Sequence, residues 1–354
     1  MYSTKFSPLL IVLYATLLLL VGCREDFTEI PSDIAVIATV NDSPHLLSVE
    51  EASVLLNSPS PPLLIEISKP EKFAQGHIPG AVNLWRPDYE DKANYPYGGI
   101  RATKEEMTGL LSGLGAQTDS LIIIYCTKGS VDAARFLWIM RGYGHQRIAM
   151  INGGKAAWQQ AKLPLTQEAT PLPPPGKFQF PKGYKQTDCA YFNDVIAAVR
   201  DSNVVLIDTR EDYEFLGIPH LVGDKIVPFK PGAFMYGNIP GSIHINWSEA
   251  VDLHGDHTFK SLKDLKYNFT TRGITPDKKI IVYCQSGVRS AHTLFVLSEI
   301  LGYPDVSNYD GSWIEWSYLN TNAHMAPVEH HTSEEDTKKI YADLVAGLSP
   351  EYKE

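Results

Sequence analysis

The sequence has few of the residues that cross-link small or metal-bound proteins. Its 354 residues include four cysteines and no C-x-x-C pair, which argues against a disulfide scaffold and against a zinc knuckle. Basic residues are also in deficit, with 31 Lys and Arg against 41 Asp and Glu. The resulting net charge of -10 has the wrong sign for a protein that follows a phosphate backbone. We therefore expect no metal site, no cofactor and no nucleic-acid partner.

The N-terminus carries an apolar run that is too short to span a bilayer. From Leu9 to Gly22 it has 14 residues, against the ~20 that a spanning helix needs, and Lys5 precedes it, which is typical of an export signal over residues 1–22. The end of the run, Leu20-Val-Gly-Cys23, is similar to the lipobox of bacterial lipoproteins, in which the cysteine is lipidated after cleavage. We therefore predict lipid on Cys23 and domains on the periplasmic side of a bacterial membrane. By resemblance to enterobacterial lipoprotein sorting, Arg24 in place of Asp favours the outer membrane. An ordinary signal with a chance cysteine, or an uncleaved anchor, is the alternative.

The chain length and a proline-rich stretch indicate two domains. At ~150 residues per domain, 354 residues correspond to about two. Four prolines lie between Pro171 and Gly176, so this stretch can continue neither a helix nor a sheet. The predicted parts are a lipoprotein signal 1–22, an N-terminal extension 23–44, a first domain 45–164, a proline-rich linker 165–187, a second domain 188–320, and a tail 321–354 whose terminal helix docks on the second domain.

The two halves contain the same segments in the same order, which indicates a tandem duplication. The matched segments are Ile65 to Phe73 with Ile207 to Phe215, Gly76 to Ala81 with Gly237 to Ser242, and Leu121 to Cys126 with Ile280 to Cys284. The spacing from Cys126 to Trp158 equals that from Cys284 to Trp316, 32 residues in each case. Two residues separate Phe73 from Gly76, whereas 21 separate Phe215 from Gly237, so the second domain carries an insertion of about 19 residues.

Each half places a cysteine at the end of a short run rich in Ile and Val. The runs are too short for helices and are typical of buried parallel strands. A glycine-containing loop and then a helical pattern follow Cys126 and Cys284. Alternating strands and helices predict an α/β fold, in which each domain is a doubly wound parallel sheet flanked by helices. Such sheets bind ligands beyond the carboxyl ends of their strands, and both cysteines lie there.

A thiol in this setting is chemically distinctive. Loop N–H groups and the positive end of a following helix lower its pKa, and the thiolate is the nucleophilic form. The same N–H groups can hold a persulfide or an anionic sulfur donor. Spacing alone leaves open the alternative that Cys126 or Cys284 is a buried structural cysteine.

Four motifs resemble those of the rhodanese family in its tandem-domain sulfurtransferase form, over about residues 63–163 and 193–318. They are Asp208-Thr-Arg210, Gly76-His-Ile-Pro-Gly80, Tyr283-Cys-Gln-Ser-Gly-Val-Arg-Ser290 and Asp310-Gly-Ser-Trp-Ile-Glu-Trp316. In that family a loop cysteine takes sulfane sulfur from thiosulfate or 3-mercaptopyruvate and passes it to cyanide or a thiol. The resemblance implies that Cys284 is the nucleophile and that Arg289 holds the donor's anionic group. The residues implied to cradle the sulfur are Gln285, Ser286, Gly287, Val288 and Arg289.

The first half departs from this pattern but keeps its cysteine. Its loop contains Lys128-Gly129, similar to thiosulfate-type loops, but Val131 stands where the second half has Arg289. Because a low thiol pKa needs cationic support, we expect most turnover at Cys284. Cys126, with Lys128 and Gly129, is a possible second site, with a vestigial or donor-binding role as the alternative. The fourth cysteine, Cys189, is predicted to be a packed helix residue behind an N-cap at Thr187-Asp188.

Two other functions compete with a sulfurtransferase that uses a small-molecule donor and a thiol or cyanide acceptor. A phosphatase or arsenate reductase on the same fold wants five residues between Cys and Arg, whereas Cys284 to Arg289 leaves four. In the first half Asp132 would repel a phosphate dianion. A non-catalytic, membrane-tethered binding module has no use for a thiol in an anion-binding loop. The sequence identifies no protein partner.

Overall fold

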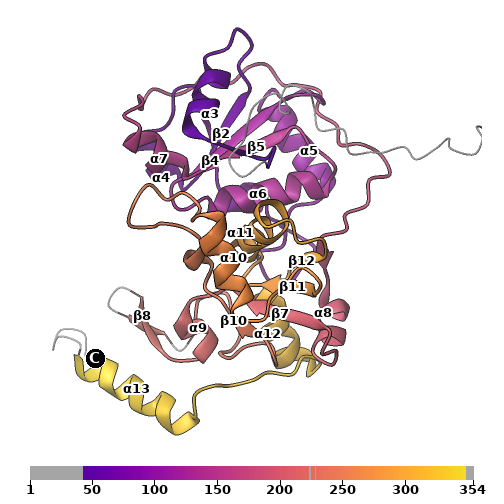
Figure 1. Cartoon of the computed structure of the whole chain (residues 1–354), viewed down its shortest axis with the longest axis vertical. Coiled ribbons are helices and arrows are strands. Elements are labelled where there is room, and N and C mark those ends of the chain that lie inside the picture. Colours follow the sequence, from indigo (N-terminus) through magenta and orange to yellow (C-terminus); the bar gives the residue numbers. More distant parts are fainter. Residues whose placement is uncertain (1–42, 223–224, 228, 348–354) are drawn as a thin grey trace, which may run out of the picture.

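The computed structural model describes residues 43–222, 225–227 and 229–347 (Figure 1). The predicted signal 1–22, Cys23 and nearly all of the predicted extension 23–44 lie outside the described residues. None of the helices in the described ranges combines the length and the apolar character needed to cross a membrane.

The first domain is built on five short strands. They are β1 (Leu46–Leu47), β2 (Leu63–Ile67), β3 (Val82–Leu84), β4 (Ile122–Cys126) and β5 (Ile148–Ile151). Its helices are α3 (Val49–Leu56), α4 (Pro70–Ala74), the 3₁₀ helix η3 (Arg86–Asp88), α5 (Lys104–Gly113), α6 (Val131–Gly142) and α7 (Gly154–Gln160). Several begin at side-chain caps: the Ser48 hydroxyl accepts from the N–H of Glu51, and the Thr103 hydroxyl accepts from that of Glu106.

The second domain repeats this plan and adds two features. Its sheet strands are β6 (Cys189–Ala190), β7 (Val204–Asp208), β10 (Ile243–His244), β11 (Lys279–Tyr283) and β12 (Val306–Tyr309). Its helices are α8 (Phe192–Ala198), α9 (Asp212–Leu216), the 3₁₀ helix η4 (Trp247–Ala250), α10 (Leu262–Thr270), α11 (Val288–Phe295), the π-helical turn η5 (Val296–Ile300) and α12 (Ser312–Ala323). The additions are a hairpin of β8 (His220–Val222) and β9 (Lys225–Val227), which lies inside the insertion, and a terminal helix α13 (Glu334–Gly347) that contacts this hairpin (Figure 1).

The two sheets have the same topology. The strand order is β1-β5-β4-β2-β3 in the first domain, and read in the same direction it is β6-β12-β11-β7-β10 in the second. Every neighbouring pair within these two sheets is parallel. The predicted α/β fold, with two domains that each hold a parallel sheet flanked by helices, is confirmed.

Strand alternation decides which way each cysteine faces. On β4, Ile122, Ile124 and Cys126 belong to one apolar cluster, whereas Ile123 and Tyr125 belong to another on the opposite face of the sheet. This follows from the two-residue period of a strand. The first cluster also contains apolar side chains of the second domain, so the core is continuous across the domain interface. Cys126 therefore lies on the face that the first domain turns toward the second.

Helices α6 and α11 form the centre of the domain interface (Figure 1). Arg135 on α6 donates from Nη2 to Asp310 Oδ1 at 2.5 Å, and the two side chains are 2% and 9% exposed. Arg135 also donates to the carbonyl of Gly287, in the loop after Cys284, at 3.4 Å. The first domain thus supports the cysteine-bearing loop of the second.

The segment between the domains packs on the first domain. Phe178 is fully buried and lies 5.1 Å from the ring of His145, and Phe180 stacks edge-on against Tyr143. The predicted helical position of Cys189 is wrong, because this residue forms the short edge strand β6, paired with Asn308 of β12. The helix begins three residues later, at Phe192.

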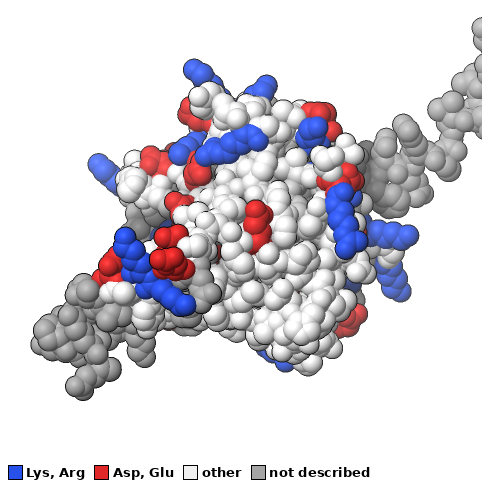
Figure 2. All heavy atoms as spheres, turned by 90° about the horizontal axis from the view of Figure 1, so that it is seen from below, with Lys and Arg blue, Asp and Glu red and all other residues white. Residues whose placement is uncertain are grey.

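Charged side chains are unevenly placed on the end of the molecule formed by the second domain. Seen from that end, Lys and Arg lie next to Asp and Glu around the rim, and the centre of the face carries few charges (Figure 2). Oppositely charged neighbours cancel much of each other's field, so this face offers no broad single-sign potential.

Candidate active site

Cys284 directly follows β11 and starts the loop that leads into α11. Its side chain is 1% exposed and lines a pocket of about 330 Å³ between the two domains. Gly287 has φ +73°, a left-handed conformation that lets the chain turn into the helix at Val288. This position corresponds to the one that the sequence predicts, beyond the carboxyl end of a parallel strand.

The surroundings of Cys284 favour its thiolate. Burial opposes the charged form, but the Arg289 guanidinium, the Ser290 hydroxyl and the N–H groups of Ser290 and Ser286 outweigh it and lower the pKa of Cys284. The Ser290 hydroxyl lies 3.5 Å from the sulfur. A thiol with a lowered pKa inside a pocket has the properties of a nucleophile.

Arg289 is held by a carboxylate of the second domain. Its Nη1 and Nη2 donate to the two oxygens of Glu214 at 2.5 and 3.0 Å, and Glu211 lies 3.7 Å away. Burial opposes both charges, yet the pairing raises the pKa of Arg289 and lowers that of Glu214 to about 2. Arg289 is therefore a fixed positive charge beside Cys284. That it also holds a donor's anionic group stays a prediction.

Ser312 anchors both ends of the loop that follows Cys284. Its hydroxyl oxygen accepts from the N–H of Cys284 at 3.2 Å and from that of Gly287 at 3.0 Å, and the hydroxyl donates to the carbonyl of Tyr309. Two of the loop residues predicted to cradle sulfur differ in how they use their N–H groups. The N–H of Ser286 is hydrogen-bonded to the Cys284 sulfur, whereas the N–H of Gly287 is hydrogen-bonded to the Ser312 hydroxyl. Gln285 donates from its side chain to the carbonyl of Pro231.

Three further cations line the pocket, and sequence reasoning singled out only Lys128. Arg86 comes from η3 of the first domain, and Lys230 comes from the insertion in the second. Arg86 is paired with Asp132 at 2.6 Å, and Lys230 lies 3.8 Å from Glu214. An alignment of the two halves could have suggested Arg86 as a binding residue, because it lies just beyond the carboxyl end of strand β3, the edge of a parallel sheet where ligands bind. No local signal marks Lys230.

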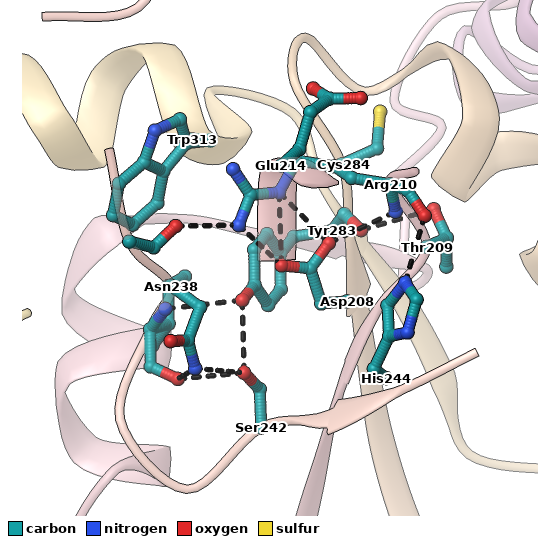
Figure 3. A network of polar contacts seen from close by, with 12 residues as sticks. Asp208, Thr209, Arg210, Glu214, Asn238, Ser242, His244, Tyr283, Cys284 and Trp313 are labelled. Carbon is teal, nitrogen blue, oxygen red and sulfur yellow. Dashed lines mark hydrogen bonds and ion pairs between the residues drawn. The ribbon is translucent and has the colours of Figure 1, made fainter. Parts of the chain in front are cut away.

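Asp208 and Arg210, at the end of β7, support the site and do not line the Cys284 pocket. The Arg210 guanidinium donates hydrogen bonds of 2.6 and 2.9 Å to the Asp208 carboxylate and another to the carbonyl of Gly237 (Figure 3). Arg210 lies over the ring of Trp313 and is 1% exposed. In the first domain Lys155 and Glu66, 2.7 Å apart, provide the equivalent buried ion pair. The Arg210 bond to Gly237 ties the end of β7 to the segment before β10, and the Lys155–Glu66 pair ties β2 to α7.

Cys126 occupies the equivalent place in the first domain with different surroundings. Burial and the charge of Asp132 raise the pKa of Cys126 to about 11, despite hydrogen bonds from N–H groups of its loop. Gly129 of this loop lies so close to the second domain that a Cβ there would be 3.2 Å from Trp247 and from Val251. The Cys126 loop is thus covered, and its thiol stays protonated near neutral pH. Lys128 lies over the Trp247 ring and faces the Cys284 pocket.

Comparisons with known proteins bear on this arrangement. The model of the rhodanese-like domain matches residues 48–161 and 192–318. The chain belongs to the rhodanese-like domain family. It is 38% identical over 255 residues to the "Sulfur carrier protein TtuD" of Thermus thermophilus, covering 70% of this chain and 84% of the relative. It is 34% identical to a "Putative thiosulfate sulfurtransferase" of Haloferax volcanii, covering 73% and 85%.

A solved structure with a similar fold is the anaerobic ergothioneine biosynthesis enzyme from Chlorobium limicola in complex with trimethyl histidine. The TM-score is 0.67 at 21% identity, and the match covers 82% of this chain and 71% of that one. The likeness establishes the shared fold of the rhodanese-like domains.

Proposed function

We propose that this protein is a sulfurtransferase in which Cys284 carries sulfane sulfur, as a persulfide, from a small anionic donor to a thiol or to cyanide. The observation that carries the proposal is the Cys284 thiol, whose pKa is lowered by Arg289 and by loop hydrogen bonds, in a pocket lined by Arg86, Lys128 and Lys230. The sulfurtransferase and sulfur-carrier names of the relatives support the same class of reaction.

The reaction has two displacement steps. The Cys284 thiolate attacks the outer sulfur of thiosulfate, a sulfur–sulfur bond forms, the original sulfur–sulfur bond breaks, and sulfite leaves with the electron pair. The loop N–H groups and Arg289 then face a persulfide anion in place of the thiolate. The acceptor attacks the terminal sulfur of the persulfide, takes it, and returns Cys284 as a thiolate.

Thiosulfate suits the pocket better than 3-mercaptopyruvate, which is the alternative donor. The pocket has positive groups on opposite walls, Arg86 and Lys128 from the first domain and Lys230 and Arg289 from the second. These four cations outnumber the two carboxylates in the lining, Asp132 and Glu211, and thiosulfate carries two negative charges in a compact body. A parallel assay with both donors decides between them. A higher kcat/KM for thiosulfate is expected, and a higher value for 3-mercaptopyruvate would reverse the assignment.

Detection of the intermediate tests the function itself. After thiosulfate is added without an acceptor, the intact mass should rise by one sulfur atom, and cyanide should remove it. An aryl phosphate should be inert, because four residues between Cys284 and Arg289 leave too short a loop for a tetrahedral phosphate. Phosphate release without a persulfide would favour a phosphatase, and neither product would favour the binding module.

We also propose that Cys23 is lipidated and holds the two domains on the periplasmic side of a bacterial membrane, with Arg24 favouring the outer membrane. The lipobox-like sequence Leu20 to Cys23 supports this. Cys23→Ser should release the protein to the soluble fraction or leave the signal uncleaved. A variant that is processed and membrane-bound like wild type would exclude the lipid.

A further inference from the structure

The second domain has two features that the first domain lacks, and they touch each other. One is the insertion, residues 216–236, and the other is the tail after α12. In Figure 1 the hairpin of the insertion and α13 lie beside each other, and α13 contacts both β8 and β9.

The C-terminal part of the insertion forms a wall of the Cys284 pocket. Lys230 and Pro231 line the pocket, and the Pro231 carbonyl accepts from the Gln285 side chain at 3.4 Å. The next residues lie along α12, where the Trp313 ring N–H donates to the carbonyl of Met235 at 3.0 Å. The position of Lys230 therefore depends on how the insertion is held at its ends.

The tail fixes both of those ends. At the start of the insertion, the Thr332 hydroxyl donates to the carbonyl of Leu216 at 2.7 Å, and the His331 ring stacks on Phe215 at 4.5 Å. At its other end, the His330 ring lies 5.0 Å from that of Tyr236.

Gly237, the first residue after the insertion, is packed tightly against the tail. A Cβ on Gly237 would lie 2.6 Å from Val328, and the φ of +115° at this position also disfavours any other residue. The neighbouring Asn238 and Glu329 exchange two backbone hydrogen bonds of 3.0 Å each.

The first domain contains the same bridge, and there the segment after it makes smaller contacts, such as the hydrogen bond of 3.4 Å from the Gln167 side chain to the carbonyl of Gln75. There His77 and Thr166 exchange two backbone hydrogen bonds of 2.9 Å, and the chain then continues into the linker. Only two residues separate Phe73 from Gly76, so there is no insertion to hold. In the second domain the bridge extends into a clamp, which we define as residues 328–347.

We propose that this clamp is a positioning element of the Cys284 site, which holds Lys230 on the pocket wall and so sets the affinity for an anionic donor. The inference rests on the proposed function. Lys230 has a half-exposed, flexible side chain, and its contact with a donor gains strength when the backbone beneath it is fixed. Within the described part of the chain, the clamp residues are not among those that line the Cys284 pocket.

The clamp can be tested by thiosulfate binding to the Cys284→Ser protein, which cannot turn the donor over. The Kd for thiosulfate should be measured by calorimetry for three forms of this protein. They are the full chain, the chain ending at Ser333, and the chain carrying both His331→Ala and Thr332→Val. The point variants remove the two contacts at Leu216 and Phe215 and keep α13. A matched control is Thr270→Val, which removes an equally exposed hydroxyl from α10.

A rise of about tenfold in Kd is expected for the clamp variants, the size of effect that one well-placed charge contributes, and no change is expected for the control. In a Lys230→Met background the clamp variants should have little further effect, because the group that they position is already gone. An unchanged Kd with a lower Tm would show that the clamp has only a structural role and would overturn the proposal. The proposal would also fail if the clamp variants raised the Kd as much in the Lys230→Met background as in the protein with Lys230.

The same variants with Cys284 intact separate the two proposals. Their KM for thiosulfate should rise while kcat changes little, since the loop around Cys284 is untouched. If the full-length wild-type chain forms no persulfide, the proposed function fails. If it forms one and the clamp variants keep the wild-type KM, the clamp proposal alone fails.

Discussion

Arg86 and Trp247 occupy equivalent positions in the two domains and face each other's cysteine loops. Each is the first residue of a 3₁₀ helix that follows the edge strand, η3 in the first domain and η4 in the second. Arg86 lines the pocket of Cys284, and Trp247 covers Gly129 beside Cys126. At this position the duplication has placed a cation beside the Cys284 pocket from the first domain and an indole over the Cys126 loop from the second. This difference adds to the effects of Arg289, which lowers the pKa of Cys284, and of burial and Asp132, which raise that of Cys126.

The first prediction concerns the division of labour between the two cysteines. Cys284→Ser should abolish persulfide formation and turnover, because the nucleophile is lost. Cys126→Ser should retain most activity, because its thiol is covered by the second domain and its pKa is raised to about 11. Intact mass after thiosulfate and steady-state rates measure both. An active Cys284→Ser and an inactive Cys126→Ser would reverse the assignment and make the first domain the catalyst.

The second prediction concerns Arg86, which reaches the Cys284 pocket from the first domain. Arg86→Met should raise the KM for an anionic donor by roughly one to two powers of ten, since a charge-assisted contact is lost. The side chain is 35% exposed, so folding should tolerate the change. Arg86→Lys should recover part of the affinity without the planar two-point contact.

Asp132→Asn is the control for the Arg86 variant. It removes the partner of Arg86 but leaves the cation in the pocket. Donor KM should therefore stay near the wild-type value or fall. If Arg86→Met keeps the wild-type KM, Arg86 does not contribute to donor binding.

The third prediction concerns the pH dependence of alkylation. A thiol reacts as its thiolate, so the cysteine with the lower pKa is labelled at the lower pH. The pKa of Cys284 lies below the ordinary 9.0, whereas those of Cys126 and Cys189 are raised by burial to about 11 and about 12. Iodoacetamide near neutral pH should therefore label Cys284 first, as peptide mapping would reveal. Arg289→Gln should shift this labelling to higher pH, and faster labelling of Cys126 would contradict the assignment.

Local sequence was sufficient for the sheets and for the Cys284 loop. Continuous runs such as Ile122 to Tyr125 specify buried parallel strands, and the equal spacing after Cys126 and Cys284 indicates the repeat. These features depend on residues that are near each other in the chain. The edge strand at Cys189 was missed because two residues carry no periodicity, and their conformation is set by pairing with β12.

The remainder of the pocket depends on contacts between distant segments. Arg86 lies 198 residues before Cys284 in the chain, and Lys230 belongs to an insertion without a counterpart in the first half. Glu214 looks like an ordinary helix residue until the fold places it against Arg289 at 2.5 Å. Such contacts follow from how α6 meets α11 across the interface, and no motif encodes that packing.

The last prediction concerns acid stability and a buried histidine at the domain interface. His292 on α11 is fully buried, stacks on Phe259 at 4.9 Å and lies edge-on to Trp247 at 5.3 Å. Burial lowers the pKa of His292 from 6.5 to about 3. The folded protein therefore binds fewer protons than the unfolded chain between these two values, and the free energy of unfolding falls as the pH drops below 6.5.

His292→Phe should keep the stacking and remove this proton linkage, which is worth at most roughly 5 kcal/mol at low pH. The variant should unfold at a lower pH than wild type in an acid titration followed by circular dichroism. His254→Phe, in an exposed loop, is the matched control and should unfold with wild type. Equal acid midpoints for the two proteins would show that other groups set the acid limit.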